Sequence, residues 1–137
     1  MRGKILLVLA AAGLVISGYL VLKTEDPSSV VCSIGGGCET VLSSQWARIG
    51  PLSVAWLGVA WYVALLVVIW LTDFSRRATP LVLIGWAASG LLFSLYLLYL
   101  EAFKIKAYCT WCLASLVIVG LIFVISFVKI KPDVPRQ

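Results

Sequence analysis

Four cysteines are the residues of this sequence whose type and spacing could do chemistry. Cys109 and Cys112 form a Cys-x-x-Cys pair in the stretch YCTWCL, where the charged segment EAFKIK gives way to a long apolar run. Cys32 and Cys38 flank a segment that contains the successive glycines Gly35–Gly37. Glycines let the chain fold back, so this second pair can reach disulfide range, in which the Cα atoms are about 4.4–6.8 Å apart. These thiols could exchange disulfides, bind a metal or form structural bridges.

The Cys-x-x-Cys spacing favours exchange chemistry at the start of a helix. Residues i and i+3 share one helix face, and the unpaired N–H groups of the first turn, together with the helix dipole, favour an anion. One thiol of such a pair can have a pKa well below the free value of about 8.5, and the thiolate is the nucleophile. The sequence contains no histidine, and thiol–disulfide exchange needs none because thiolates attack and leave directly.

Two other roles for the cysteines stay open. Four thiolates could carry mercury or zinc across a membrane, although closed zinc sites usually have two tight cysteine pairs or pairs with histidine. Both pairs could also be purely structural disulfides, although a Cys-x-x-Cys disulfide closes a small ring that is often strained, and strained disulfides tend to be labile. Spacing and topology favour redox chemistry, and we assign no metal ligand.

Composition predicts that membrane helices position these cysteines. The 137 residues are 62% hydrophobic and 12% charged, whereas a soluble domain is about half apolar and about a quarter charged. A spanning helix needs about 20 apolar residues, and four charge-free runs qualify, at about residues 5–22, 54–71, 81–100 and 107–128. The sequence therefore predicts an all-α integral membrane protein, a four-transmembrane-helix bundle forming a single domain over residues 1–137, with no carboxylate inside a span.

The first run also resembles a cleavable secretion signal, because it follows a basic start. An apolar signal region is typically about 7–15 residues long and ends in a small-residue cleavage site. This run continues past Gly18 to Lys23 without a polar cleavage region. We therefore expect it to remain as the first membrane helix.

The lysines and arginines predict the orientation, because short cytoplasmic loops carry an excess of them. With four spans both termini share one side, and that side has seven basic residues against four on the other. The seven are Arg2, Lys4, Arg76, Arg77, Lys129, Lys131 and Arg136. We expect a multi-pass protein of the cell membrane with both termini cytoplasmic and all four cysteines on the exoplasmic (periplasmic) side, where disulfides persist. The basic balance is then an orientation signal and not a nucleic-acid patch.

The first exoplasmic loop, residues 23–53, is predicted to contain a short amphipathic helix. From Glu39 onward, positions recur at spacings of three and four, which is typical of a helix of about three turns; they are Val41, Leu42, Gln45, Trp46 and Ile49. With Trp46 on its apolar side, such a helix would lie along the membrane surface and cap the bundle. The alternative is a solvated loop with one structural disulfide.

The order of these motifs resembles the vitamin K epoxide reductase family, especially its bacterial members. The likeness rests on CSIGGGCETVLSSQWARIGPLSVAWLGVAWY and FSLYLLYLEAFKIKAYCTWC, which contain the loop cysteine pair, Ser-Ser-x-Trp, Gly-x-x-x-Tyr and Cys-x-x-Cys. The resemblance implies a quinone-dependent thiol–disulfide oxidoreductase that oxidises a thioredoxin-fold, DsbA-like partner and supports disulfide bond formation. The electron acceptor would be ubiquinone, menaquinone or a vitamin K-like quinone. Many bacterial relatives carry a fused thioredoxin-like domain; here nothing follows KIKPDVPRQ, so we expect a stand-alone homologue with a separate partner.

The resemblance also implies a role for each cysteine. Cys32 and Cys38 would be the shuttle pair that meets the thiols of the partner. Cys109 would exchange with Cys38, and Cys112 would face the quinone. Epoxide reduction is not expected, because the sequence lacks the asparagine that human-type members place in the second helix, and Leu116 stands where they have a tyrosine.

A quinone head would fit an apolar cleft with few polar groups near the exoplasmic ends of the helices. Ser44 matches the hydroxyl residue that the family places after the loop cysteines. The other candidates are Trp56 and Leu57 on the second helix and Phe93, Tyr96 and Tyr99 on the third. The alternative role of the aromatic residues is an ordinary interfacial belt.

Overall fold

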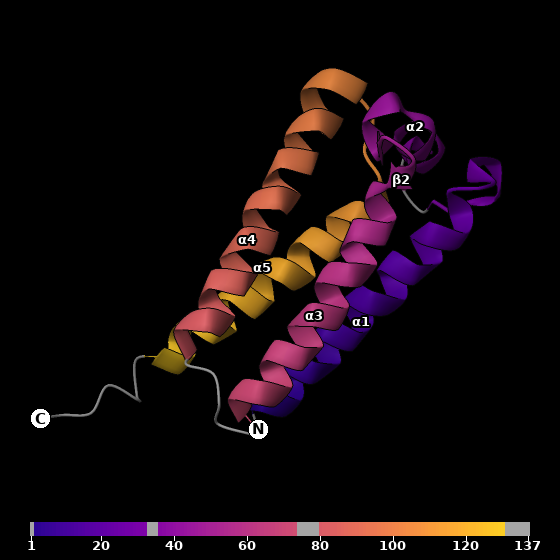
Figure 1. Ribbon diagram of the computed structural model, residues 1–137. Coiled ribbons are helices and arrows are strands. Elements are labelled where there is room, and N and C mark those ends of the chain that lie inside the picture. Colours follow the sequence, from indigo (N-terminus) through magenta and orange to yellow (C-terminus); the bar gives the residue numbers. More distant parts are fainter. Residues whose placement is uncertain (1, 33–35, 74–79, 131–137) are drawn as a thin grey trace, which may run out of the picture.

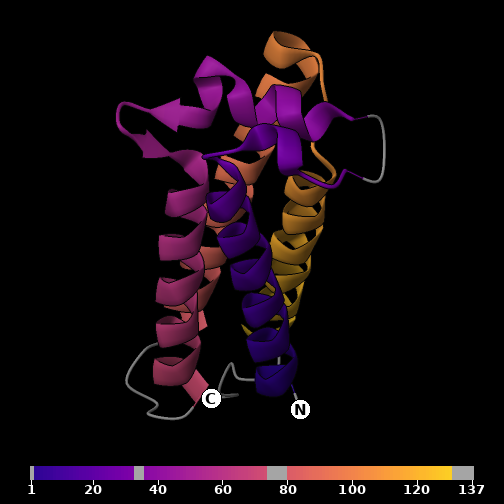
Figure 2. The same ribbon diagram turned by 90° about the vertical axis from the view of Figure 1, so that its right-hand side faces the viewer.

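Four long helices form a bundle, and the smaller elements gather at one end of it (Figures 1 and 2). The computed structural model describes residues 2–32, 36–73 and 80–130. The long helices are α1 (Arg2–Lys23), α3 (Val54–Asp73), α4 (Pro80–Tyr99) and α5 (Thr110–Ile130). Helix α1 packs against α3 and α5, and α4 packs against α5 and α3. The start of α1 and the end of α5 lie at the same end of the bundle, opposite α2 (Figure 1).

The described residues contain four helices that are long and apolar enough to cross a membrane. These candidate spans are Gly3–Lys23, Val54–Thr72, Leu81–Ile105 and Thr110–Val128. Helices suit a bilayer because they satisfy their own backbone hydrogen bonds where lipid offers no partners. The prediction of an all-α, four-helix membrane protein is confirmed. The third span is longer than predicted, however, and it includes Glu101, so the expectation that no carboxylate lies within a span is wrong.

The main core lies between the long helices and is built from aliphatic side chains around Tyr62. Tyr62 is only 2% exposed, and its hydroxyl shares a 2.8 Å hydrogen bond with the hydroxyl of Ser115, which ties α3 to α5. The tyrosine ring reaches α1 where there is no side chain, since a Cβ atom on Gly13 would lie 2.6 Å from the Tyr62 oxygen. The remaining buried members are Leu6, Ala10, Leu65, Ile69, Leu83, Ala87, Val119 and Ile122.

The connection between α1 and α3 covers the end of the bundle that carries the cysteines. It contains the 3-10 turns η1 (Pro27–Ser29) and η2 (Gln45–Ala47), helix α2 (Gly37–Ser43), and strands β1 (Arg48–Ile49) and β2 (Leu52–Ser53). The two strands form an antiparallel hairpin in which Ile49 is paired with Leu52. In Figure 2 these elements lie across the tops of the long helices.

Helix α2 is shorter than the predicted amphipathic helix. Val41 and Leu42 are buried, as their spacing indicated, but the helix ends at Ser43 because Ser44 is extended. The hydroxyl of Ser44 donates a 2.7 Å hydrogen bond to the Val41 carbonyl, a local bond that competes with continuation of the helix. Ile49 therefore lies in a strand, and its predicted place on the helix is wrong.

The connection between α4 and α5 turns the chain back toward the bundle. Helix α4 continues into the π-helical segment η3 (Leu100–Ile105), which ends at Lys106 with a left-handed φ of 57°. The following residues are not helical, and α5 begins at Thr110 rather than at Ala107. Cys109 thus immediately precedes the first helical residue of α5, where its carbonyl accepts a 3.0 Å hydrogen bond from the N–H of Leu113.

Candidate active site

The loop cysteines form a disulfide at the mouth of the bundle. Cys32 and Cys38 are bonded, and their Cα atoms are 5.9 Å apart, as the fold-back of the intervening segment predicted. Of the glycines expected to turn the chain, Gly35 lies outside the described residues, and Gly36 adopts a left-handed φ of 62° directly before α2. The bridge thus attaches the start of α2 to the segment that follows α1 and η1.

Helix α2 places Cys38 beside Cys109 by a close backbone contact. A Cβ atom on Gly37 would lie 2.8 Å from the backbone nitrogen of Tyr108 and would collide with its carbonyl oxygen, so only glycine allows this approach. The residue after Gly37 is Cys38, and the residue after Tyr108 is Cys109. Both cysteines have no exposed surface, and they belong to one buried cluster. The fold therefore brings one cysteine of each pair into the same apolar environment.

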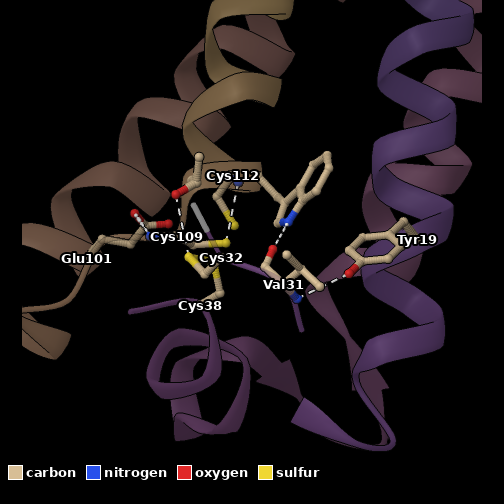
Figure 3. Close-up of a disulfide and its surroundings, with 9 residues drawn as sticks. Tyr19, Val31, Cys32, Cys38, Glu101, Cys109 and Cys112 are labelled. Atoms are coloured by element: carbon tan, nitrogen blue, oxygen red, sulfur yellow. Dashed lines mark hydrogen bonds between the residues drawn. A yellow bond between two sulfur atoms is a disulfide. The ribbon is translucent and has the colours of Figure 1, made fainter. Parts of the chain in front are cut away.

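A second contact holds the Cys32 side of the loop on α5 (Figure 3). The indole N–H of Trp111, which lies between the two helix cysteines, donates a 2.8 Å hydrogen bond to the Val31 carbonyl. The Val31 N–H donates a 3.3 Å hydrogen bond to the Tyr19 hydroxyl, and the Tyr19 and Trp111 rings pack with centroids 5.0 Å apart. The sulfur of Cys32 lies 3.4 Å from the Thr110 hydroxyl. Trp111 was not among the predicted site residues, although a tryptophan inside the Cys-x-x-Cys motif is visible in the sequence.

The helix cysteines are both free thiols at the start of α5. The N–H of Cys112 donates a 3.4 Å hydrogen bond to the sulfur of Cys109. The side-chain hydrogen bond with Cys112 lowers the pKa of the Cys109 thiol, although burial and the nearby Glu101 carboxyl act in the opposite direction. Cys109 is therefore held as the more readily ionised thiol, and the thiolate is the form that attacks a disulfide.

Glu101 is a buried carboxyl, although it is the first residue of the charged segment EAFKIK. Its side chain is only 3% exposed, and its Oε2 atom accepts a 3.3 Å hydrogen bond from the N–H of Cys109 (Figure 3). The carboxyl is also within hydrogen-bonding reach of the Cys112 thiol. The sequence did contain an indication of this burial. Glu101 directly follows the apolar run FSLYLLYL, with no turn-forming residue between them.

A cavity of about 620 Å³ lies between the long helices beside Cys112. Ligand pockets typically have volumes of about 300–1,000 Å³ with mostly apolar walls and a few polar groups. Cys112 and Glu101 line this cavity, whereas Cys109 does not. The two helix cysteines thus differ in position: Cys109 lies against the loop pair, and Cys112 borders the cavity.

Only some of the residues predicted to hold a quinone line this cavity. Ser44, Leu57 and Phe93 line the cavity. Trp56 is 53% exposed and does not line it; Tyr96 borders a smaller cavity together with Phe93. Tyr99 is half-exposed and packs against Phe103. Tyr62, the tyrosine of the Gly-x-x-x-Tyr motif, also lines the main cavity, although it was not among the residues predicted to hold the quinone.

A family model described as the Vitamin K epoxide reductase family matches residues 4–127, a range that contains all four long helices in large part and all four cysteines. The chain belongs to the vitamin K epoxide reductase family. Members of this family are membrane-embedded thiol–disulfide oxidoreductases that generally use quinones and work with thioredoxin-like partners. This homologue is accordingly an oxidoreductase, and the loop disulfide next to a helix dithiol is the arrangement that such exchange requires.

The alternative role of the four cysteines in this vitamin K epoxide reductase homologue is to bind a metal ion that is carried across the membrane. Over residues 2–32, 36–73 and 80–130, no group of three or more His, Cys, Asp or Glu side chains is arranged to hold a metal ion. Two of the four thiols are covalently joined in the structure.

Proposed function

We propose that this protein oxidises the dithiol of a thioredoxin-fold partner and passes the electrons to a membrane quinone. The observation that carries the proposal is the position of Cys109 and Cys112. Cys109 is buried with Cys38 of the loop disulfide, and Cys112 lines an apolar cavity. One sulfur of the pair thus lies with the loop disulfide and the other borders the cavity, which supports electron transfer from a protein partner to a membrane-soluble acceptor.

The relay begins at the loop disulfide. A thiolate of the partner attacks the Cys32–Cys38 bond, and the second partner thiol completes the exchange, so that the partner leaves oxidised and both loop cysteines are reduced. The Cys38 thiolate then attacks Cys109 of an oxidised Cys109–Cys112 pair, because Cys38 and Cys109 are buried members of the same cluster. A Cys38–Cys109 disulfide forms, and Cys112 leaves as a thiolate beside the cavity.

The relay ends with the helix pair reduced. Cys32 attacks Cys38, which re-forms the Cys32–Cys38 disulfide and releases Cys109. This product has the bonding pattern seen here, a loop disulfide and two free helix thiols. A quinone bound beside Cys112 would supply an acceptor for two electrons and two protons. Transfer of the two electrons to that acceptor would re-form the Cys109–Cys112 disulfide for the next cycle.

The cavity walls suit a quinone ring. The lining is mainly apolar, with the hydroxyls of Ser44 and Ser115 and the carboxyl of Glu101 among its few polar groups. We propose that Leu57 and Phe93 pack on the ring and that Ser44 lies near one of its oxygens. Trp56 and Tyr96 are proposed to contact lipid or the outer part of the quinone, because both are about half exposed.

The proposed orientation has both termini in the cytoplasm and the cysteine end of the bundle outside. It is supported by the excess of lysine and arginine on the side of the termini and by the lasting stability of disulfides outside the cytosol. A membrane-impermeant thiol reagent should label the reduced loop cysteines in intact cells. Labelling only after the membrane is opened would contradict this orientation.

The decisive test is oxidation of a thioredoxin-fold dithiol substrate by the purified protein with and without a quinone. We expect turnover only when quinone is present, and we expect Cys109→Ala and Cys112→Ala each to abolish it while the protein remains folded in the membrane. Retained turnover in both single variants would favour the purely structural role of the cysteines. Stoichiometric zinc or mercury on the reduced protein, with no response to quinone, would favour a metal carrier.

A double variant separates the loop pair from the helix pair. Cys32→Ala/Cys38→Ala should still oxidise a small dithiol that reaches the helix pair directly, but it should not oxidise the protein substrate. Because loss of a native disulfide typically costs about 2–5 kcal/mol, folding of this variant is checked by thermal unfolding. Unchanged oxidation of the protein substrate would rule out the shuttle role.

A further inference from the structure

Glu101 is buried without a cationic partner among the described groups that act on it, so its carboxyl contributes little to the stability of the fold. It is almost fully buried, and it contacts the backbone of Cys109 and the side chain of Cys112. In the described part of the chain no basic side chain is among the groups that act on it. Burying a carboxylate without a cationic partner costs free energy, and a well-packed apolar residue would stabilise such a site better. Its neighbours are instead the two thiols that must lose protons when the helix pair is oxidised.

Glu101 also borders the space proposed for the acceptor. Its side chain and that of Cys112 both line the main cavity, on the side where η3 meets α5. The carboxyl is thus adjacent both to the sulfur that would transfer electrons and to the volume that would hold the acceptor oxygens. The side chain of Cys109 contributes nothing to the cavity wall.

We propose that Glu101 is the proton carrier of the Cys109–Cys112 pair, an inference that rests on the proposed quinone-dependent function. The Glu101 carboxylate takes the proton of the Cys112 thiol, so the thiolate forms without a change of net charge in the buried site. A bond then forms between the two sulfurs as two electrons leave for the quinone. Both thiol protons pass in turn through Glu101 to the two quinone oxygens, and Glu101 returns to the carboxylate. A dithiol and a quinone are consumed, and a disulfide and a quinol are produced.

Two conservative variants distinguish this role from a merely structural one. Glu101→Gln keeps the length of the side chain and an oxygen that can accept the Cys109 N–H, but it cannot take up a proton. Glu101→Asp keeps a carboxyl but is one methylene shorter, which weakens the contact with the Cys109 backbone. A structural role predicts that the Gln variant is the better enzyme, and a proton-carrying role predicts that the Asp variant is the better one.

The first measurement is quinone-dependent oxidation of a thioredoxin-fold dithiol by wild-type protein and both variants. General acid–base catalysis typically contributes about 100- to 10,000-fold to a rate, so we expect turnover of Glu101→Gln to fall by about 100-fold or more. Glu101→Asp should keep clearly more activity than Glu101→Gln. The opposite order would make Glu101 a positioning residue and overturn the inference.

The second measurement needs no quinone and no turnover. The reduced protein is alkylated with iodoacetamide across the neutral pH range, and modification of Cys112 is located by peptide fragmentation. The titratable groups that face Glu101 are Cys109 and Cys112, so an internal proton acceptor should make alkylation of wild-type Cys112 nearly independent of pH. In Glu101→Gln the thiol must lose its proton to water, and the rate should rise about tenfold per pH unit, with the thiolate fraction.

These measurements separate failure of the inference from failure of the proposed function. Wild-type protein that does not respond to quinone would overturn the proposed function and the inference with it. Quinone-dependent wild-type protein with the Gln variant more active than the Asp variant would overturn the inference alone. If Glu101→Gln does not fold, the wild-type alkylation profile decides, because a tenfold rise per pH unit in wild-type protein would show that no internal acceptor serves Cys112.

Discussion

Gly37→Ala should uncouple the two cysteine pairs with a single methyl group. The added Cβ would lie 2.8 Å from the Tyr108 nitrogen, and its other close neighbours are also backbone atoms, which cannot rotate away. Since unstrained carbon contacts begin at about 3.5 Å, α2 must move by roughly 1 Å. Overpacking of this kind costs about 1–3 kcal/mol, whereas alanine itself is favoured over glycine in a helix by up to about 1 kcal/mol. The cost of the clash therefore outweighs the gain in helix propensity, and the variant should be less stable than wild type.

The same displacement should slow exchange between Cys38 and Cys109. A misplacement of about 1 Å can cost about 100-fold in rate when reacting groups must be aligned. We expect oxidation of a thioredoxin-fold substrate to fall by about that factor, while oxidation of a small dithiol that reacts directly at the helix pair stays close to wild type. Both rates are measured with excess quinone, together with thermal unfolding.

Gly18→Ala is the matched control for this experiment. Gly18 lies on α1, and a Cβ there would meet no atom within 4 Å. The control should therefore leave both rates unchanged, and it should raise the stability by up to about 1 kcal/mol because alanine is the better helix former. Wild-type rates and stability in Gly37→Ala would refute the reasoning, because they would show that the contact of α2 with Tyr108 does not set the position of Cys38.

Three further changes test individual contacts of the site. In Cys112→Ser, a Cys38–Cys109 disulfide should accumulate after oxidation, because Cys109 has lost its helix partner. Non-reducing peptide mapping detects this disulfide. A predominant Cys32–Cys109 disulfide would reverse the proposed order of the two loop cysteines in the relay. In reduced Cys112→Ala, the pKa of Cys109 should rise, because the hydrogen bond with Cys112 is the main cause that lowers it. The midpoint of Cys109 alkylation should then move to higher pH, and an unmoved midpoint would assign the lowered pKa to another cause. Trp111→Phe keeps an aromatic ring but loses the 2.8 Å bond to the Val31 carbonyl, which should cost about 1 kcal/mol and speed hydrogen exchange around Val31; unchanged protection there would show that the bond does not hold the loop.

The sequence predicted least well which side of each long helix faces the interior of the bundle and which side faces lipid. A soluble helix shows its buried side as an apolar stripe, but the long helices here are apolar all round. Lipid and the bundle interior accept the same side chains, so the pattern does not separate them. Leu57 therefore lines the cavity while its neighbour Trp56 is exposed, and no periodicity distinguished the two in advance.

Sequence patterns were sufficient to predict the class of the protein, the number of its spans and the cysteines that are its candidate redox groups. Span length and hydropathy are local properties, because each membrane helix satisfies its own backbone hydrogen bonds. The loop disulfide was likewise local, since only a short glycine-containing segment separates Cys32 from Cys38. Tertiary packing brings Cys38 and Cys109 into one cluster and leaves Cys112 rather than Cys109 at the cavity. It also buries Glu101 against the backbone of Cys109 and the side chain of Cys112. The contact of Cys38 with the start of α5 joins segments far apart in the chain. It depends on how α2 packs at Gly37 and on the turn that η3 makes before α5, and no local pattern encodes either.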